Sequence, residues 1–172
     1  NNSEQLQIAE QLQRLSHQDG LTGLFNRRHF DDTILREWRR LRREQAPLGL
    51  LMLDVDYFKR FNDELGHQAG DDALRQLAAA LNRALTREGD CICRYGGEEF
   101  LLLLRDTEQE YAIETAEKIR KAVEEHEMVL PGTTIKKTIS IGVAVYPDDS
   151  HTFWQVVKYA DVALYNAKET GR

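Results

Sequence analysis

An apolar segment, Leu48 to Leu53, stops at two carboxylates, Asp54 and Asp56. Its unbroken apolar run predicts a strand that is buried on both faces. Residues two apart in an extended chain lie on the same side, so one cation could contact both aspartates. Burying a carboxylate costs free energy unless it is paired or binds a metal. Strand-end aspartates also occur as simple helix caps, so this pair alone leaves both functions open.

Two glycines and two glutamates, Gly96-Gly97-Glu98-Glu99, stand between segments with strand character at 91–95 and 99–104. The spacing predicts a tight hairpin, and glycines at its tip let the backbone approach a ligand closely. The alternative is an exposed turn with solvated acids. If the hairpin lies beside the strand that ends at Asp54, three acidic groups converge. Such a cluster is typical of sites that hold Mg²⁺ with a substrate's phosphates.

Apolar spacing predicts the elements that must position these acids. Helices are expected at 3–16, at 58–65, at 108–126 and at the end of the chain. Two further helices should begin after the cap Asn26 and after a loop framed by Gly66 and Gly70, the second with Asp71 or Asp72 as its cap. A loop is expected over 128–133 and a half-buried strand over 139–145. The fold class is therefore α+β, with a central, mostly antiparallel sheet flanked by helices.

Length and charge exclude several classes of protein. The 172 residues fit one domain, expected over 19–172, and a short appendage over 1–18 that is the end of a coiled coil or a frayed helix. The net charge of −6 argues against a nucleic-acid partner, which needs a basic face. No apolar run approaches the roughly 20 residues of a membrane span. Cys91 and Cys93 lack a metal pattern and are expected as buried thiols of a reducing compartment.

Four motifs together resemble the GGDEF family of diguanylate cyclases. They are Asp19-Gly-Leu-Thr-Gly-Leu-Phe-Asn-Arg-Arg28, Asp54-Val-Asp-Tyr-Phe-Lys59, Arg94-Tyr-Gly-Gly-Glu-Glu-Phe100 and Ala167-Lys-Glu-Thr-Gly-Arg172. The resemblance implies a fold akin to the nucleotidyl-cyclase and polymerase palm. It also implies that two GTP become cyclic di-GMP and two pyrophosphates, each 3′-hydroxyl attacking the α-phosphorus of the other GTP. Each domain holds one GTP, so the resemblance implies a homodimer.

The resemblance also implies roles for individual residues. Mg²⁺, with Mn²⁺ as an alternative, is expected on Asp54, the Val55 carbonyl and the glutamates Glu98 and Glu99. One glutamate takes the 3′-hydroxyl proton; Glu99 is favoured for this and Glu98 as the ligand, but the sequence does not separate them. The phosphates are expected at the amides near Phe58, at Lys59, which belongs to the catalytic set, and at Lys168 and Arg172. For Lys168 and Arg172 the alternative is a cationic helix end that answers the helix dipole.

Two further sites follow from the resemblance. Asp71 and Asn62 are expected to read the guanine edge, with His67 beside them as either a ligand or a loop-packing residue. Arg87 and Asp90 match an inhibitory product site, where Lys118 stands in place of the family's further arginine. Lysine lacks the planar fork of arginine. Without the family, Arg87 and Asp90 would be a surface ion pair of little effect.

The expected function is a diguanylate cyclase with product feedback. One alternative is a catalytically silent receptor that binds cyclic di-GMP through Arg87 and Asp90, and another is a palm enzyme such as a mononucleotide cyclase. We expect a cytoplasmic domain. It would be the output domain of a longer protein, even a membrane-anchored one, with an upstream sensory or receiver domain.

Overall fold

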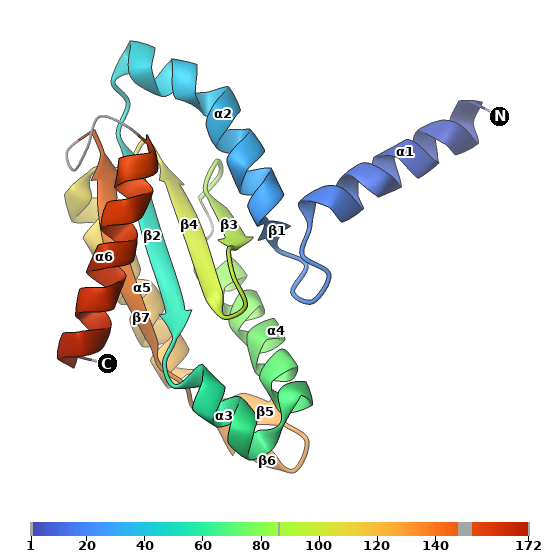
Figure 1. Cartoon of the computed structure of the whole chain (residues 1–172), viewed down its shortest axis with the longest axis vertical. Coiled ribbons are helices and arrows are strands. Elements are labelled where there is room, and N and C mark those ends of the chain that lie inside the picture. The colour runs from blue at the N-terminus through green and yellow to red at the C-terminus, as the bar shows by residue number, and fades with distance from the viewer. Residues whose placement is uncertain (1, 86, 148–152, 172) are drawn as a thin grey trace.

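A central five-stranded sheet organises the chain, in a computed structural model that describes residues 2–85, 87–147 and 153–171 (Figure 1). The strand order is β1-β3-β4-β2-β7. The bounds are β1 Phe25–Asn26, β2 Leu48–Val55, β3 Cys91–Arg94, β4 Glu99–Arg105 and β7 Ile139–Tyr146. β2 pairs antiparallel with β4 and β7, and β3 pairs antiparallel with β4, whereas β1 runs parallel to β3. The mostly antiparallel sheet predicted from the sequence is confirmed.

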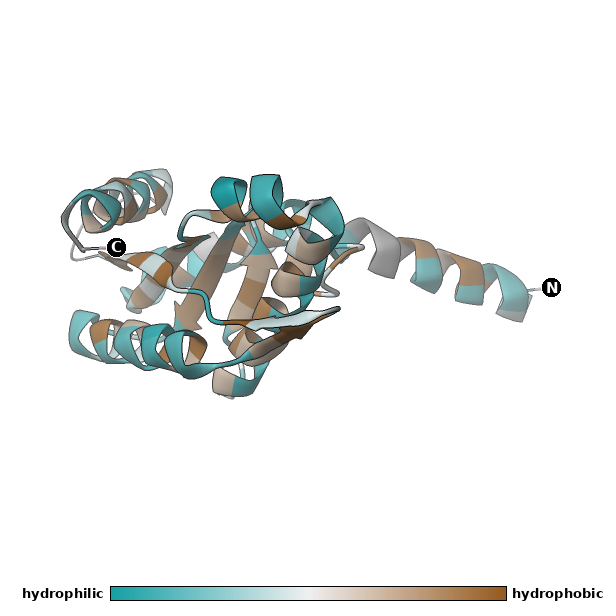
Figure 2. Cartoon of the chain, turned by 90° about the horizontal axis from the view of Figure 1, so that it is seen from below, coloured by the Kyte–Doolittle hydropathy of each residue, from teal (hydrophilic) through white to brown (hydrophobic). Residues whose placement is uncertain are grey.

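Helices cover both faces of this sheet, as Figures 1 and 2 show. Along the chain, the helices are α1 Asn2–His17, which does not cover the sheet, α2 Arg27–Glu44, α3 Phe58–Leu65, α4 His67–Ala84, α5 Gln109–Glu125 and α6 Phe153–Gly171. Leu51 and Leu53 of β2 pack with α4 and α5 in one core, while Leu50 and Met52 pack with α2 and α6 in the other. The unbroken apolar run of β2 is therefore explained by burial on both faces.

The strand β7 differs from its prediction. A half-buried strand is expected from alternating large and small residues, but Ser140, Gly142 and Ala144 are buried as well. They face α6, and a Cβ built on Gly142 would lie 2.1 Å from the carbonyl oxygen of Ala160. The small residues thus mark a close helix contact rather than a solvated face.

Three local predictions are also corrected. α4 begins at His67, one residue after Gly66, so neither Asp71 nor Asp72 caps it and Gly70 lies inside the helix. The segment expected as a loop over 128–133 contributes to a small hairpin of β5 (Met128–Leu130) and β6 (Thr133–Ile135). Gly132 has a φ of +79°, which suits the turn between them. The two-residue β1 has no signal in the apolar pattern.

Other predictions agree with the structure. Asn26 caps α2 through a hydrogen bond that its side chain accepts from the His29 amide. Cys93 is buried as predicted, whereas Cys91 is only partly buried; burial raises the pKa of the Cys91 and Cys93 thiols to about 11 and about 12. Apolar spacing also predicts Leu15 on the apolar stripe of the first helix and Trp38 and Phe153 on the inward faces of theirs; these three side chains lie outside those that the structure describes.

Helix α1 extends away from the sheet (Figure 1) and exposes Leu6, Ile8 and Leu12. This agrees with the helix predicted over 3–16. Among the described residues, no helix combines the length and apolarity that a membrane crossing needs.

Candidate active site

Three acids meet where β2 and β4 pair. Asp54 lies opposite Glu99 in the antiparallel register, and Glu98 precedes Glu99 in the signature turn, residues 95–98. The turn is closed by the Tyr95 and Gly96 amides, which donate to the Glu99 carbonyl at 2.8 and 3.2 Å. We call Asp54, Glu98 and Glu99 the acidic cluster. The strand pairing on which the sequence analysis made this convergence depend is present.

The acidic cluster is electrostatically frustrated. Partial burial and then the charge of Asp54 raise the pKa of both Glu98 and Glu99 above the usual glutamate value. Asp161 of α6, which the sequence analysis did not single out, adds to the rise at Glu99. Lys168 opposes the rise at both glutamates. Like charges that raise one another's pKa are typical of sites that bind a cation.

The two carboxylate oxygens of Asp54 differ in their hydrogen bonding. It is 7% exposed, and its Oδ2 accepts a hydrogen bond from the Lys168 ammonium. Its Oδ1 is buried and has no hydrogen-bond partner among the described residues. An unpartnered buried carboxylate oxygen is costly, and a metal ion would satisfy it. Lys168, expected at the phosphates, here contacts Asp54.

The oxygen donors suit a hard divalent cation such as Mg²⁺. Asp54, Glu98 and Glu99 supply carboxylates, and Val55 is the last residue of β2, directly after Asp54. Within the described ranges, however, no three His, Cys, Asp or Glu side chains gather closely enough to hold a metal ion as they stand. A cation at Asp54 would compete with Lys168 and draw the glutamates closer.

Asp56 does not join this cluster. Its carboxylate is 1% exposed and accepts hydrogen bonds from the hydroxyls of Thr138 and Ser140, both at 2.7 Å. Its amide donates to the Thr138 carbonyl at 3.0 Å. Asp56 therefore fastens the end of β2 to the start of β7, and the two-aspartate cation site suggested by the alternation is wrong.

The start of α3 offers amides to an anion. Tyr57 precedes the helix with a φ of +57° and makes no side-chain cap, and Phe58 and Lys59 begin the helix directly after the acidic end of β2. The first N–H groups of a helix lack intrahelical partners and attract negative charge. Lys59 is exposed beside them, whereas the Phe58 side chain is buried.

The corner between α3 and α4 brings the Asn62 side chain against Gly70, the residue before Asp71. The Asn62 Oδ1 is buried without a hydrogen-bond partner in the described part of the chain. A Cβ on Gly70 would lie 1.8 Å from this atom, so a glycine is needed there to seat the amide. Asp71 follows Gly70, and His67 is the first residue of α4; both are exposed.

A long-range ion pair that the spacing did not indicate holds the signature turn. Arg94 donates to the Gly97 carbonyl at 2.8 and 3.2 Å and to both oxygens of Asp19 at 3.2 Å. Burial opposes ionisation of Asp19, but hydrogen bonds from Thr22 and the charge of Arg94 outweigh it and lower its pKa. The motif that opens at Asp19 thus positions the turn; only its place in the family motif could have indicated this.

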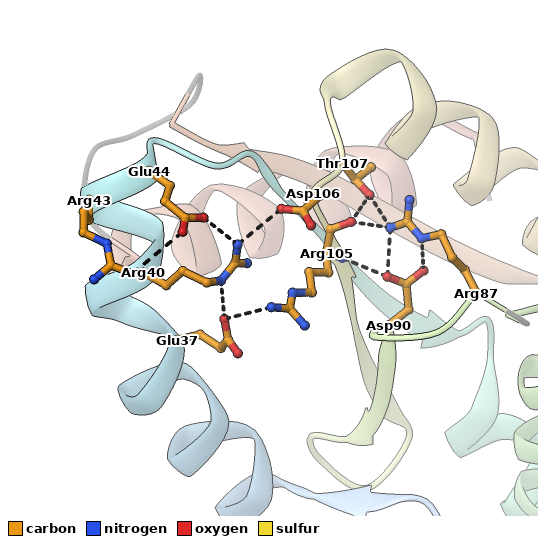
Figure 3. A network of polar contacts seen from close by, with 9 residues as sticks. All are labelled: Glu37, Arg40, Arg43, Glu44, Arg87, Asp90, Arg105, Asp106 and Thr107. Carbon is orange, nitrogen blue, oxygen red and sulfur yellow. Dashed lines mark hydrogen bonds and ion pairs between the residues drawn. The ribbon is translucent and has the colours of Figure 1, made fainter.

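Arg87 and Asp90 form a closed clamp on the opposite end of the hairpin (Figure 3). Arg87 Nε and Nη2 donate to the two Asp90 oxygens at 2.9 and 2.8 Å, and Nη2 also reaches the Arg105 carbonyl and the Thr107 hydroxyl. The Asp90 side chain is 2% exposed and accepts from the Arg105 amide at 2.8 Å. The pair is therefore largely buried on the Asp90 side, unlike an ordinary surface ion pair.

Helix α5 carries both Tyr111, which contacts this clamp, and Lys118. The Arg87 guanidinium lies over the Tyr111 ring at 5.1 Å from its centre. Lys118 follows Tyr111 by seven residues, two helical turns along the same face, and is exposed. Arg172 lies outside the described residues.

Comparison with known proteins decides the family. The profile described as "Diguanylate cyclase, GGDEF domain" matches residues 16–172. The chain belongs to the GGDEF family. Its signature, Gly96-Gly97-Glu98-Glu99-Phe100, is the acidic-cluster hairpin described above.

Relatives of this GGDEF domain carry related names. Diguanylate cyclase A of Treponema denticola is 43% identical over 129 residues, which cover 75% of this chain and 34% of that protein. The probable diguanylate cyclase DgcC of Escherichia coli K12 is 39% identical over 163 residues, 94% of this chain and 43% of that protein. The chain thus spans less than half the length of these curated relatives.

Solved GGDEF structures share the fold. The coiled coil and GGDEF domain of DgcB from Caulobacter crescentus, in complex with c-di-GMP, superposes with a TM-score of 0.89 at 34% identity, covering 99% of this chain and 91% of that one. The α+β sheet flanked by helices is therefore that of the cyclase palm.

Proposed function

We propose that this GGDEF domain is a diguanylate cyclase, which condenses two GTP into cyclic di-GMP and two pyrophosphates. The observation that carries the proposal is the acidic cluster, with the unpartnered Oδ1 of Asp54, directly before the uncapped start of α3. That arrangement offers carboxylates for a cation and amides for phosphates side by side. In-line phosphoryl transfer needs little more than such positioning and charge stabilisation.

The metal ion and the acids have different roles in the proposed reaction. Mg²⁺, or Mn²⁺ in its place, would be held by Asp54, the Val55 carbonyl and Glu98, and would stabilise charge on the α-phosphate. Glu99 is our candidate to accept the 3′-hydroxyl proton, because a raised pKa brings a carboxylate closer to the value of an effective base at neutral pH. Glu98 and Glu99 share burial and the Asp54 charge as the two largest causes of their raised pKa, so exchanged roles are the alternative.

Phosphate and base binding use the neighbouring helices. We assign the phosphates to the Phe58 amide region, Lys59 and Lys168, with Arg172 as a further candidate. Guanine is assigned to Asn62 and Asp71, with His67 at the rim: an amide and a carboxylate can accept from the N1 and N2 donors of guanine. The seat that Gly70 leaves for Asn62 supports this assignment.

Catalysis in this proposal needs two copies, because each domain brings one GTP. The exposed Leu6, Ile8 and Leu12 of α1 are suited to pairing with the same helix of a second copy. We place the domain in the cytoplasm as the output of a longer protein, with an upstream sensory or receiver domain. Product feedback is assigned to Arg87, Asp90 and Lys118.

Product analysis tests the proposal. Incubation with GTP and Mg²⁺, followed by chromatography and mass spectrometry, is expected to give one cyclic di-GMP for two pyrophosphates. Glu99→Gln is expected to lower the rate by about 10²–10⁴-fold, the usual contribution of a proton acceptor. Glu114→Gln, at an exposed position on α5, is the matched control and should keep the parent rate.

Two outcomes would contradict the proposal. A cyclic mononucleotide as the sole product would indicate a different palm reaction. Binding of cyclic di-GMP without any synthesis, in dimeric protein with Mg²⁺ or Mn²⁺, would indicate the silent receptor.

A further inference from the structure

A cavity of about 210 Å³ lies between α2 and the sheet, away from the acidic cluster. Leu48 and Cys91 of its lining begin β2 and β3, and Arg105 ends β4, whereas Asp54 and Glu99 lie at the other ends of β2 and β4. The described lining also includes Thr33, Ile34, Glu37, Arg40, Leu41 and Leu103. The cavity is therefore separate from the proposed GTP site.

The walls of this cavity are mostly apolar. Ile34, Leu41, Leu48 and Leu103 are each at most 5% exposed and belong to the core shared by α2 and α6. An apolar cavity of about 150 Å³ is enough to bind benzene, so this one has room for a single ring and a small polar group. The buried Thr33 hydroxyl has no hydrogen-bond partner in the described part of the chain. A ligand with a polar atom could satisfy it.

The cavity lining contains two arginines, Arg40 and Arg105, that differ in their ion pairs (Figure 3). Arg40 is paired with Glu37 at 2.8 Å, Glu44 at 3.1 Å and Asp106 at 3.6 Å. Arg105, in contrast, forms a long ion pair with Glu37 at 3.9 Å, and its side chain is 44% exposed. Arg40 is therefore well neutralised, whereas the Arg105 guanidinium has one long ion pair, to a carboxylate that Arg40 also holds. Arg105 can thus accept a ligand's negative charge, and the arginine fork fits a carboxylate.

We propose that this cavity binds a small organic monocarboxylate, with its apolar body between α2 and β4 and its carboxylate on Arg105. The main chain of Arg105 also touches the clamp, because its amide donates to Asp90 and its carbonyl accepts from Arg87. An occupied cavity therefore changes the surroundings of Arg87. The proposal is independent of the cyclase activity.

Benzoate and benzyl alcohol test the proposal as a charged and a neutral probe of the same size. In titrations of the ¹⁵N-labelled chain, benzoate is expected to shift the amides of Thr33, Leu103 and Arg105 saturably. The Arg87 side-chain Nε–H is expected to shift with them. Benzyl alcohol should bind about tenfold more weakly, since it lacks the ion pair with Arg105.

Substitutions separate the charge from the cavity. Arg105→Ala keeps the main-chain bonds and should reduce benzoate affinity to that of benzyl alcohol, whereas Glu37→Gln should raise it. Arg39→Ala, at an exposed arginine of α2 outside the lining, is the control and should change neither. Thr33→Leu fills the cavity and should abolish both interactions.

Three results would overturn the proposal. They are equal affinity for the two probes, benzoate affinity unchanged in Arg105→Ala, and no saturable shift at millimolar benzoate. If Thr33→Leu does not fold, the Glu37→Gln and Arg105→Ala pair still decides the question.

Discussion

At the scale of single residues, the acidic cluster holds charge that the protein alone does not neutralise. Burial and then the charge of Asp54 raise the pKa of Glu98 and Glu99, and Lys168 offsets only part of the rise. A carboxyl whose folded pKa is raised makes its stabilising contribution below the unfolded value, and this is lost as the pH rises through the folded pKa. The cluster therefore opposes folding at neutral pH, as expected for a site built to receive a cation.

Removing the central charge should make this visible. In Asp54→Asn without added metal, the pKa values of Glu98 and Glu99 should both fall toward the usual glutamate value, because the Asp54 charge, which is the largest cause of both rises after burial, is gone. Carbon-detected NMR titration of the side-chain carboxyls measures this. Asp72→Asn, on α4, is the control and should leave both values in place. A parent-like titration of both glutamates in Asp54→Asn would contradict the cluster.

Base recognition makes a second prediction at this scale. Asp71→Ala should weaken binding of a non-hydrolysable GTP analogue by about 1–3 kcal/mol, because guanine donors are left unpaired. The loss should be smaller for the inosine counterpart, which lacks the 2-amino group. Calorimetry measures both, and Asp72→Ala, whose carboxylate pairs with Arg75 at 2.7 Å, is the matched control. Equal losses for the two analogues would remove Asp71 from the base edge.

Sequence spacing predicted the residues of the acidic cluster but not all of their surroundings. Asp54 and the signature glutamates could be found because a buried strand and a glycine turn are local patterns. The fate of Asp56 could not, since its partner Thr138 lies 82 residues away. Arg94 and Asp19 are 75 residues apart. Such partners depend on the strand order, which short-range periodicity does not contain.

At the scale of elements, the contact between β7 and α6 positions Lys168. The helix approaches the strand only because Gly142 has no side chain, and Lys168 at its far end then contacts Asp54. Period-two alternation of large and small residues is the same for a solvated strand face and for a face closely covered by a helix, so the sequence predicted a half-buried β7. A close helix and open water are distinguished only by the packing.

Enlarging this glycine should loosen the site as well as the fold. Gly142→Ala would place a methyl group against the backbone of Ala160 and Leu164, and overpacking of this kind typically costs about 1–3 kcal/mol. Thermal unfolding should show the loss, and NMR should show Lys168 leaving Asp54. Gly20→Ala, where a Cβ meets nothing within 4 Å, is the control. An unchanged midpoint for Gly142→Ala would refute the contact.

At the scale of the whole molecule, the Arg87–Asp90 clamp has two roles to reconcile. It ties the segment before β3 to the end of β4 and the start of α5, and it is also our proposed product site. Breaking a buried pair by removing one partner leaves an uncompensated charge, which is strongly destabilising. Arg87→Ala would therefore lose feedback and stability together, and a loss of inhibition in that variant would not identify the site.

Lys118 separates the two roles, because it is exposed on α5 and outside the clamp. Lys118→Arg should bind cyclic di-GMP more tightly and strengthen product inhibition, since a guanidinium can donate two parallel hydrogen bonds where an ammonium cannot. Lys118→Ala should weaken both, and neither change should move the unfolding midpoint by more than about 1–2 °C. Calorimetry with cyclic di-GMP, synthesis rates at rising product concentration and thermal unfolding supply the three readouts. Lys121→Ala, one turn further along α5, is the control.

If Lys118→Arg and Lys118→Ala were both inhibited like the parent, Lys118 would have no part in feedback. The inhibition would then rest on Arg87 and Asp90 without this helix.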